Sequence, residues 1–393
     1  MNYRQESLKK HAEWKGKIET VCRVPVGDRE SLSLAYTPGV AEPCMAIHAD
    51  IDKSFELTRR WNTVPVITDG TAILGLGDIG PEAGMPVMEG KCALFKAYGG
   101  VDAYPLCIKS KDTEEIIKTI KLLSGSFGGI NLEDISAPRC FEIETRLKAE
   151  LDIPVFHDDQ HGTAIVMTAA LMNALKLAKK DKKSISVVIN GAGAAGISIA
   201  RFLMNYGVKT VTLCDKQGII CEGESWLNPV QSEMARTTNR KHLRGTLKDA
   251  MAGADVFIGV SGPNCVTKDM VRSMAERSIL FTCANPVPEI DPNDAKDAGA
   301  FIVGTGSSAH PNQINNVLVF PGLFRGALDV RAKTVNTEMM IAAAEGIAAC
   351  VTDEQLSREY ILPYAYDKSA HDCVAKAVAE AAVRSGATKK HVK

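Results

Sequence analysis

The stretch ISVVINGAGAAGISIARFLMNYG, residues 185–207, decides the fold class of this chain. An apolar run of strand length leads into the glycine pattern G-x-G-x-x-G, and a segment with helical periodicity follows it. Glycines let the backbone approach a pyrophosphate closely, and the following helix offers free N–H groups and the positive end of its dipole. The stretch therefore predicts a Rossmann-type, doubly wound α/β domain whose dinucleotide-binding residues are Gly191, Ala192, Gly193, Ala194, Ala195 and Gly196.

The choice of dinucleotide depends on the end of the next predicted strand, residues 209–215. This strand ends in Asp215, where a carboxylate can accept a hydrogen bond from the ribose 2′-OH of NAD. The same carboxylate repels the 2′-phosphate of NADP. We therefore expect NAD to be favoured, with the neighbouring Lys216 acting in the opposite direction.

Two acidic clusters, in NLEDIS and VFHDDQHGT, follow short apolar runs that read as buried strands. In a doubly wound sheet the carboxyl ends of the strands bind ligands, so we expect these side chains to meet there. Carboxylates held together resist ionisation unless a cation neutralises them, and an all-oxygen set suits Mg²⁺ or Mn²⁺ better than zinc. Each acidic residue alone could be a helix N-cap, but the pair of clusters favours a metal site. Its members are Glu133, Asp134, Asp158 and Asp159.

A glycine-rich segment, residues 68–95, precedes the acidic clusters and ends near Lys91. Its density of glycine indicates tight turns or close approach of the backbone to a ligand. We expect Pro81 and Pro86 to interrupt any helix there. An apolar run after Lys91 would bury its stem, and a buried lysine can act as a general base. Spacing alone favours the simpler alternative, a lysine whose ammonium reaches water.

Three uncharged polar residues are further candidates for the site. Tyr36 lies on a predicted loop broken by proline and glycine, where tyrosine is more often a packing residue. Asn285 precedes a proline at a predicted strand end, where it could hydrogen-bond a nicotinamide or a carboxylate. Asn316 lies on a predicted loop at 310–322. Amide side chains are often structural, so both asparagines stay open at this point.

Length and composition limit the possible architectures and the possible binding partners. At 393 residues we expect two domains, an α/β domain at 1–160 and a Rossmann-type domain with C-terminal helices at 161–393. A formal net charge of −1 gives no long-range attraction for nucleic acid or an anionic membrane. The 11 cysteines include no C-x-x-C pair, which favours free thiols in a reducing compartment. With no signal-peptide pattern and no apolar run of membrane length, we expect a cytoplasmic protein.

The motifs YTPGVAEPC, TDGTAILGLGDIG, EGKCALF, NLEDI, FHDDQHGT, GAGAAG, ANP and NNVLVFPG occur in this order. From about residue 15 to 385 the chain closely resembles the malic enzymes, in their short bacterial form. The resemblance implies a malic-enzyme domain followed by the NAD(P)-binding domain. It also implies metal-dependent oxidative decarboxylation of L-malate to pyruvate and CO₂, with reduction of NAD or NADP.

The resemblance also implies roles for individual residues. Lys91 would be the general base, Tyr36 the general acid, and Asp158 the residue that holds Lys91. The ligands of Mg²⁺ or Mn²⁺ would be Glu133, Asp134 and Asp159, and the contacts to substrate or nicotinamide would come from Lys91, Asn285 and Asn316. Larger family members carry a substrate-binding arginine where this chain has Thr71 and Ala72. The residue that replaces this arginine is not assigned.

Three alternatives stay open at this point. A malolactic enzyme would keep its NAD bound and release lactate, and only its products distinguish it. A nucleotide-sensing regulator would keep the Rossmann half without catalysis, but the intact catalytic and carboxylate set speaks against it. A plain dehydrogenase would not need the set Glu133, Asp134 and Asp159. Because loops near N-terminal arms often cross dimer interfaces, we expect a homodimer or higher oligomer.

Overall fold

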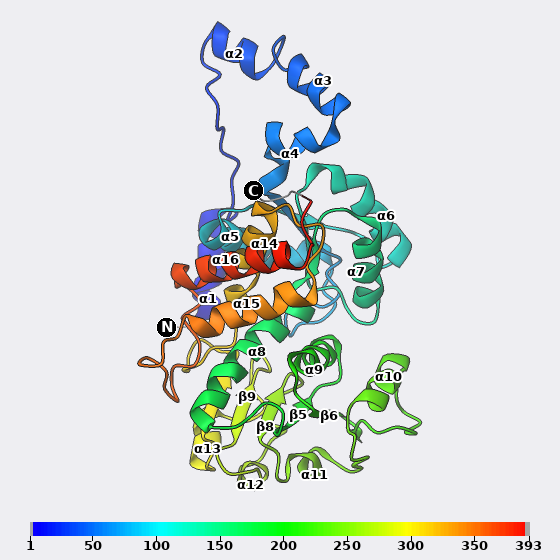
Figure 1. Ribbon diagram of the computed structural model, residues 1–393, viewed down its shortest axis with the longest axis vertical. Coiled ribbons are helices and arrows are strands. Elements are labelled where there is room, and N and C mark those ends of the chain that lie inside the picture. Colours follow the sequence, from blue (N-terminus) through cyan, green and yellow to red (C-terminus); the bar gives the residue numbers. More distant parts are fainter. Residues whose placement is uncertain (1–2, 390–393) are drawn as a thin grey trace.

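The computed structural model in Figure 1 describes residues 3–389, so both extreme ends of the predicted domains lie outside the described residues. The first of its two sheets has four parallel strands in the order β2-β1-β3-β4. Continuous apolar strands of this kind need cover on both faces. Helix α5 packs on β1 and β2, while apolar residues of α6 and α7 pack against β3 and β4. The elements are β1 (Thr63–Thr68), α5 (Pro81–Gly99), β2 (Asp102–Cys107), α6 (Thr113–Leu123), β3 (Ile130–Leu132), α7 (Arg139–Glu150) and β4 (Val155–His157).

The second sheet lies in the lower part of Figure 1 and has the order β10-β9-β8-β5-β6-β7. All neighbours pair in parallel except β6 and β7. The strand order reverses beside β5, because β6 and β8 pair with opposite sides of it. This topological switch point confirms the predicted doubly wound, Rossmann-type arrangement. The elements are β5 (Ser186–Asn190), α9 (Ala194–Tyr206), β6 (Thr210–Asp215), β7 (Gly218–Ile219), β8 (Val256–Gly259), β9 (Ile279–Thr282) and β10 (Ile302–Thr305).

One long helix, α8 (Asp158–Ala178), joins the two sheets. It begins directly after β4, and its small, buried residues pack against α9 and α15. Together with residues of both sheets, it contributes to one continuous apolar core. The boundary expected at residue 160 falls in the first turn of this helix and stays a prediction.

The C-terminal helices pack on elements of the first sheet as well as on helix α8. They are α14 (Phe320–Asp329), α15 (Thr337–Ala349) and α16 (Lys368–Arg384). Helix α14 packs against α5, where the ring of Phe95 lies 4.7 Å from that of Phe320 and 5.3 Å from that of Phe324. The helix that carries Lys91 is therefore held by residues from near the end of the chain.

Two helices form where prolines were expected to prevent them. Helix α5 begins at Pro81, and α3 (Ala41–Ala49) contains Pro43 in its first turn. The first N–H groups of a helix have no intrahelical partner, so proline costs little there. Pro86 lies farther inside α5 and removes one hydrogen bond, but the buried side chains beyond it keep the helix packed. The glycine-rich segment is therefore a strand–loop–helix unit, and the expectation of an interrupted helix was wrong.

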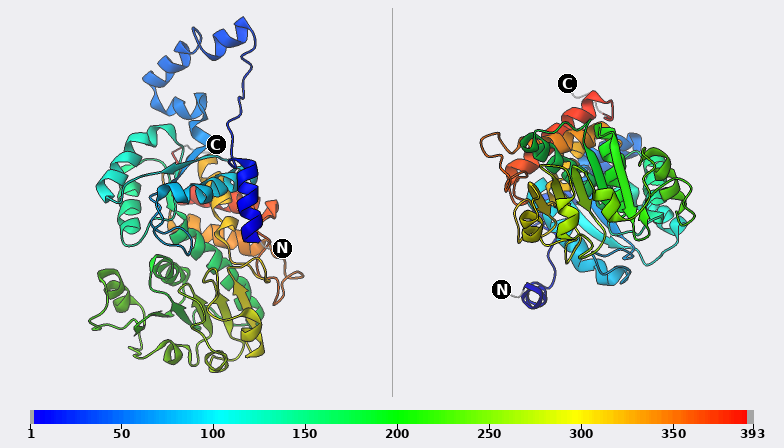
Figure 2. Two further views of the ribbon diagram at one scale, coloured as in Figure 1. Left: turned by 180° about the vertical axis from the view of Figure 1, so that it is seen from behind. Right: turned by 90° about the horizontal axis from the view of Figure 1, so that it is seen from below.

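An N-terminal arm projects from the rest of the chain, as both Figure 1 and the left view of Figure 2 show. It comprises α2 (Arg29–Ala35) and α3, and all residues of these helices keep solvent exposure. Large apolar side chains such as Leu34, which is 72% exposed, and Met45 lie open to water.

Among the helices of residues 3–389, none combines the length and apolar character needed to cross a bilayer.

Candidate active site

Lys91 is the buried centre of the site at the carboxyl edge of the first sheet. Its side chain is only 7% exposed, and its Nζ lies 4.5 Å from the ring centre of Phe320. Nζ donates a hydrogen bond to Glu133 Oε1 at 2.5 Å and another to Asp158 Oδ2. Burial alone would lower the pKa of Lys91, but the surrounding carboxylates raise it above its usual value. The expected alternative, a lysine with its ammonium in water, is therefore wrong.

Three of the four predicted carboxylates form a cluster suited to a cation. Glu133, Asp134 and Asp159 each offer an oxygen, and these atoms lie within 4.8 Å of one another. Burial and mutual repulsion raise the pKa of Glu133, and they raise that of Asp134 to about 8. Within the described residues, Asp134 Oδ2 is buried and has no hydrogen-bond partner. Because a hard divalent ion would neutralise the repulsion and coordinate this orphaned oxygen, these residues fit Mg²⁺ or Mn²⁺.

Asp158 differs from the other carboxylates because it faces Lys91. It is the first residue of α8 and is fully buried. Burial raises its pKa to about 6, with Lys91 acting in the opposite direction. A Cβ atom at Gly162 would lie 1.9 Å from Asp158 Oδ1 and 3.2 Å from the Cβ of Asn316. Gly162 therefore leaves the space in which Asp158 and Asn316 come together.

A buried glutamate that sequence reasoning missed supports the start of α8. Glu144 of α7 accepts hydrogen bonds from the backbone N–H of His157 at 3.1 Å and pairs with His161 Nε2 at 2.8 Å. It thereby holds the turn between β4 and α8, where Asp158 and Asp159 lie. Glu144 belongs to the apolar stripe of its helix, with Cys140, Ile143 and Leu147. A carboxylate in such a stripe is the signal that would have identified it.

The loop after β1, which contains Thr71 and Ala72, is tied to the acidic cluster. Thr71 Oγ1 donates to Asp69 at 2.6 Å and accepts from the backbone N–H of Ser136 at 2.9 Å. The backbone N–H of Ala72 donates to the carbonyl oxygen of Asp134 at 3.0 Å. Arg139, which sequence reasoning did not select, donates to Asp69 at 2.7 Å. Thr71 and Ala72 thus hold the loop against the cluster.

After β5, the second sheet presents backbone at its carboxyl edge, while the charged Asp215 lies at the end of the neighbouring strand β6. Gly191 has φ +117°, and a Cβ atom there would lie 2.6 Å from the carbonyl oxygen of Val260. A Cβ atom at Gly196 would lie 1.7 Å from the carbonyl oxygen of Gly191, so α9 packs too closely on β5 for any side chain. Gly193 faces open space, and α9 begins directly after it without a side-chain cap. This combination leaves N–H groups available to a pyrophosphate.

The loops of the two sheets meet beside Asn285. A Cβ atom at Gly75, in the loop after β1, would lie 2.8 Å from the carbonyl oxygen of Asn285. Behind Asn285, the fully buried Glu289 accepts hydrogen bonds from the backbone N–H groups of Ser261 and Ala284, each at 3.1 Å. Glu289, another residue that the sequence pattern did not reveal, ties the loop after β8 to the loop after β9.

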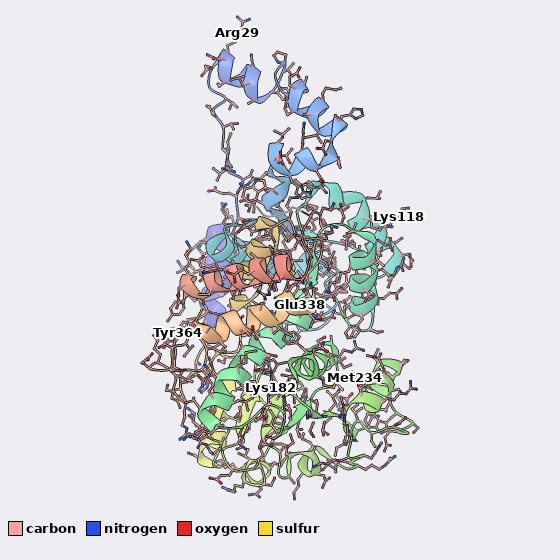
Figure 3. All side chains as sticks on the ribbon, viewed as in Figure 1. Arg29, Lys118, Lys182, Met234, Glu338 and Tyr364 are labelled. Atoms are coloured by element: carbon pink, nitrogen blue, oxygen red, sulfur yellow. The ribbon has the colours of Figure 1, made fainter. Side chains whose placement is uncertain are left out.

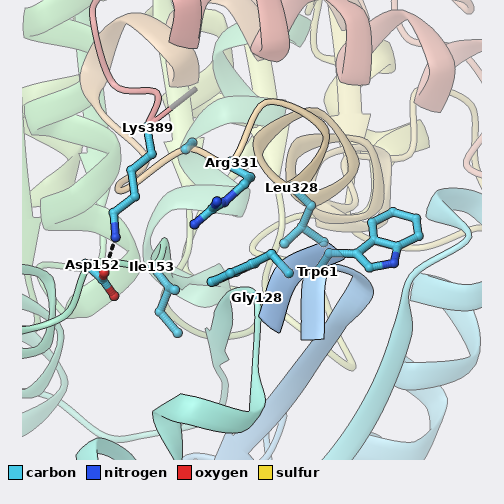
Figure 4. A pocket seen from close by; sticks show the side chains of 9 residues that line it. Trp61, Gly128, Asp152, Ile153, Leu328, Arg331 and Lys389 are labelled. Carbon is cyan, nitrogen blue, oxygen red and sulfur yellow. Dashed lines mark hydrogen bonds and ion pairs between the residues drawn. The ribbon is translucent and has the colours of Figure 1, made fainter. Parts of the chain in front are cut away.

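Tyr36 is not brought to Lys91 within a single chain. It caps the C-terminal end of α2 on the projecting arm, and its side chain is 67% exposed. The structure thus gathers Lys91, Glu133, Asp134, Asp158, Asp159 and Asn316 at one edge, while Asn285 and the glycine loop lie at the edge of the second sheet. A separate cavity near Trp61 and Arg331 measures only about 10 Å³, enough for one water molecule (Figure 4).

A buried, lysine-centred acidic site joined to a glycine-loop sheet defines a two-domain oxidoreductase of the dinucleotide-binding class. Comparison with known families gives a closer assignment. Residues 15–148 match the malic enzyme N-terminal domain, and residues 160–383 match the malic enzyme NAD binding domain. The chain belongs to the malic enzymes, which confirms the resemblance found in its sequence.

Individual relatives are similar along almost the whole chain. The bifunctional malic/malolactic enzyme of Bacillus subtilis is 56% identical over 98% of this chain and 94% of its own length. The NAD-dependent malic enzyme of Geobacillus stearothermophilus is 54% identical over 95% of this chain and 78% of its own length. The crystal structure of the NAD-dependent malic enzyme from Thermotoga maritima has a TM-score of 0.92 and 49% identity, with 95% of this chain and 98% of that chain covered.

Proposed function

We propose that this malic enzyme carries out oxidative decarboxylation of L-malate at the Lys91 site, with Mg²⁺ or Mn²⁺ bound and NAD preferred over NADP. Its products are pyruvate, CO₂ and the reduced cofactor. The observation that carries the proposal is the burial of Lys91 between Asp158 and the cluster of three carboxylates. Family membership supports the reaction, and the geometry supports the roles of these residues.

The residues divide the chemistry between them. Glu133, Asp134 and Asp159 would hold the divalent ion, which supplies Lewis-acid polarisation of malate's oxygens when bound. With a divalent ion bound, the carboxylates that keep Lys91 charged would be neutralised, so that Nζ could lose its proton and then accept that of the C2 hydroxyl as a hydride leaves C2 for the nicotinamide. Asp158 would keep the lysine oriented. Asn316, beside Asp158, and Asn285, beside the glycine-rich loop, would orient the substrate and the nicotinamide.

We assign the proton delivered to C3 after loss of CO₂ to Tyr36 of a second copy of the chain. The arm that carries Tyr36 exposes large apolar side chains, and a dimer would cover them. Mixing Tyr36→Phe with Lys91→Ala variants, after exchange of subunits, tests this arrangement. Each heterodimer would regain one intact site of its two. Because random exchange makes about half of the dimers heterodimers, an equimolar mixture would regain roughly a quarter of the wild-type activity. If activity does not return although exchange is shown by mass, Tyr36 does not act across the interface.

The preference for NAD rests on Asp215 at the end of β6. Relatives of this chain include both NAD-dependent and NADP-dependent malic enzymes, so membership of the family supports the nucleotide without choosing between the two forms. A carboxylate at this position favours a free 2′-OH. Parallel assays with NAD and NADP give the ratio of the activities with the two cofactors directly.

The decisive experiment follows reduced nicotinamide by absorbance with L-malate, Mn²⁺ and either cofactor, and then assays pyruvate. We expect reduced cofactor and pyruvate in equal amounts, and loss of both with a chelator. Because one relative is named a bifunctional malic/malolactic enzyme, lactate is measured in the same reaction. Lactate without net reduced cofactor would replace the proposed reaction with the malolactic one.

We also propose a reducing, cytoplasmic location for the enzyme. All 11 cysteines are free, although several are buried. Free thiols in this number are typical of proteins kept in a reducing compartment. Cell fractionation with an antibody to this chain tests the location, and recovery outside the cytoplasmic fraction would exclude it.

A further inference from the structure

Gln231 connects the two parts of the candidate dinucleotide site. It lies in α10 (Pro229–Thr237), the helix that Figure 3 marks with Met234, and is only 6% exposed. Its Nε2 donates a hydrogen bond to Asp215 Oδ2 at 2.6 Å and a longer one to the carbonyl oxygen of Ala192 at 3.4 Å. One buried amide thus touches both the glycine loop and the acidic residue at the end of β6.

The orientation of this amide is determined by its other end. Gln231 Oε1 accepts a hydrogen bond from the backbone N–H of Asn228 at 3.1 Å, as part of the capping box of α10. Because the oxygen is engaged there, the NH₂ group must face Asp215. The second oxygen of Asp215, Oδ1, accepts from the backbone N–H of Lys216 at 2.7 Å. Both oxygens of the carboxylate are therefore held, and each keeps lone pairs for a ribose hydroxyl.

We propose that Gln231 is a specificity-determining residue, which positions Asp215 for a 2′-OH and against a 2′-phosphate. This inference rests on the proposed preference for NAD. A carboxylate held before the cofactor arrives does not have to be ordered by it, so binding of NAD is stronger. Without the Gln231 donor, Asp215 could turn away from the glycine loop, and the exposed Lys216 could then approach a 2′-phosphate.

Direct binding titrations of the full chain with NAD and NADP, in the absence of malate, test the inference. In Gln231→Met we expect the Kd for NAD to rise about tenfold, the effect of losing one hydrogen bond to a charged group. The Kd for NADP should change by less than about threefold, so the ratio of the two constants moves toward NADP. An unchanged ratio would overturn the proposal.

Asn228→Ala is the matched control because it breaks the other half of the same capping box, the hydrogen bond from the Gln231 backbone N–H to Asn228 Oδ1, and leaves the Gln231–Asp215 contact. We expect it to lower the melting temperature as Gln231→Met does, with the cofactor ratio unchanged. If it shifts the ratio equally, helix capping explains the effect and the proposal is wrong.

A double-mutant cycle separates positioning from direct contact with the nucleotide. In an Asp215→Ala background, Gln231→Met should leave the Kd for NAD unchanged if Gln231 acts through Asp215 and not through its longer contact with Ala192. A full additional tenfold loss would contradict this. The wild-type ratio tests the proposed NAD preference separately, since its value does not depend on any variant.

Discussion

The two sheets of this enzyme carry their candidate binding residues at the same kind of edge but present different atoms there. At the first sheet the site consists of buried ionisable side chains around Lys91, whose pKa values are shifted by burial and by one another. At the second sheet the candidate site consists mainly of the backbone of a glycine loop, with Asp215 as its charged side chain. The residues of the first edge suit proton and metal chemistry, and those of the second suit the binding of a nucleotide. Substitutions at the two edges should therefore impair different properties, turnover at the first edge and nucleotide binding at the second.

The largest effect is expected at the lysine. Lys91→Ala should lower turnover of malate by roughly 10³-fold, the range found for removal of a general base, and leave binding of NAD close to wild type. Steady-state rates and a separate NAD titration check both parts. Lys96→Ala, an exposed lysine on the same helix, is the control. Near-normal turnover of Lys91→Ala would remove the lysine from the mechanism.

At the glycine loop we expect the loss of NAD binding instead of a loss of catalysis. In Gly196→Ala the new methyl group meets the carbonyl oxygen of Gly191, and the free energy of unfolding should fall by about 2 kcal/mol, with loss of NAD binding. Gly193→Ala has open space and should weaken NAD binding with little change in stability. Urea unfolding and cofactor titration measure the two quantities. Equal stability of the two variants would show that close packing of α9 on β5 is not required.

A smaller effect is expected for one of the proposed metal ligands. Asp159→Asn should raise the Mn²⁺ concentration needed for half-maximal activity by about tenfold or more, while the Kd for NAD stays unchanged. Asp372→Asn, on the exposed surface of α16, serves as the control. An unchanged Mn²⁺ requirement would show that the cation binds elsewhere.

The smallest effect is expected at the amino edge of the first sheet, where Asp102 begins β2. Burial raises the pKa of Asp102, but hydrogen bonds from Arg59, Lys96 and Asn62 outweigh this and lower it to about 2. Because the folded-state pKa lies below the unfolded value of about 3.9, the carboxylate stabilises the fold above pH 4. This contribution is lost as the pH falls from about 4 through 2.

Asp102→Asn should therefore lower the free energy of unfolding by about 1 kcal/mol at pH 7, after allowance for solvent screening at this partly exposed group. The difference from wild type should shrink as the pH falls, and urea unfolding between pH 7 and pH 3 measures it. Turnover and the Mn²⁺ requirement should not change, since the amino edge carries none of the site. A difference that does not depend on pH would contradict the assignment to this ion pair.

The same contrast explains what the sequence could predict. Glycine spacing and the order of the strands were sufficient to predict the Rossmann-type second sheet, because a binding loop made of backbone atoms depends on the local sequence pattern. The acidic residues of the first sheet were visible because they follow apolar runs directly. Glu144, Gln231 and Glu289 were missed, since their partners are distant in the sequence and no period links them. The loop predicted at 310–322 overlaps the start of α14, because the packing of Phe320 and Phe324 against α5 depends on tertiary contacts.

Helix α8 has a consequence for recombining this enzyme with its relatives. The helix carries Asp158 and Asp159 in its first turn and packs on α9 along its length, so its rotational register links the two sites. One inserted residue would turn everything beyond it by about 100°. A chimera joined at residue 160 cuts this helix, whereas a junction at 180–185 falls in the turn beyond it. Exchanges of cofactor specificity between family members should therefore use the later junction, which leaves the metal site and its supporting helix from a single parent.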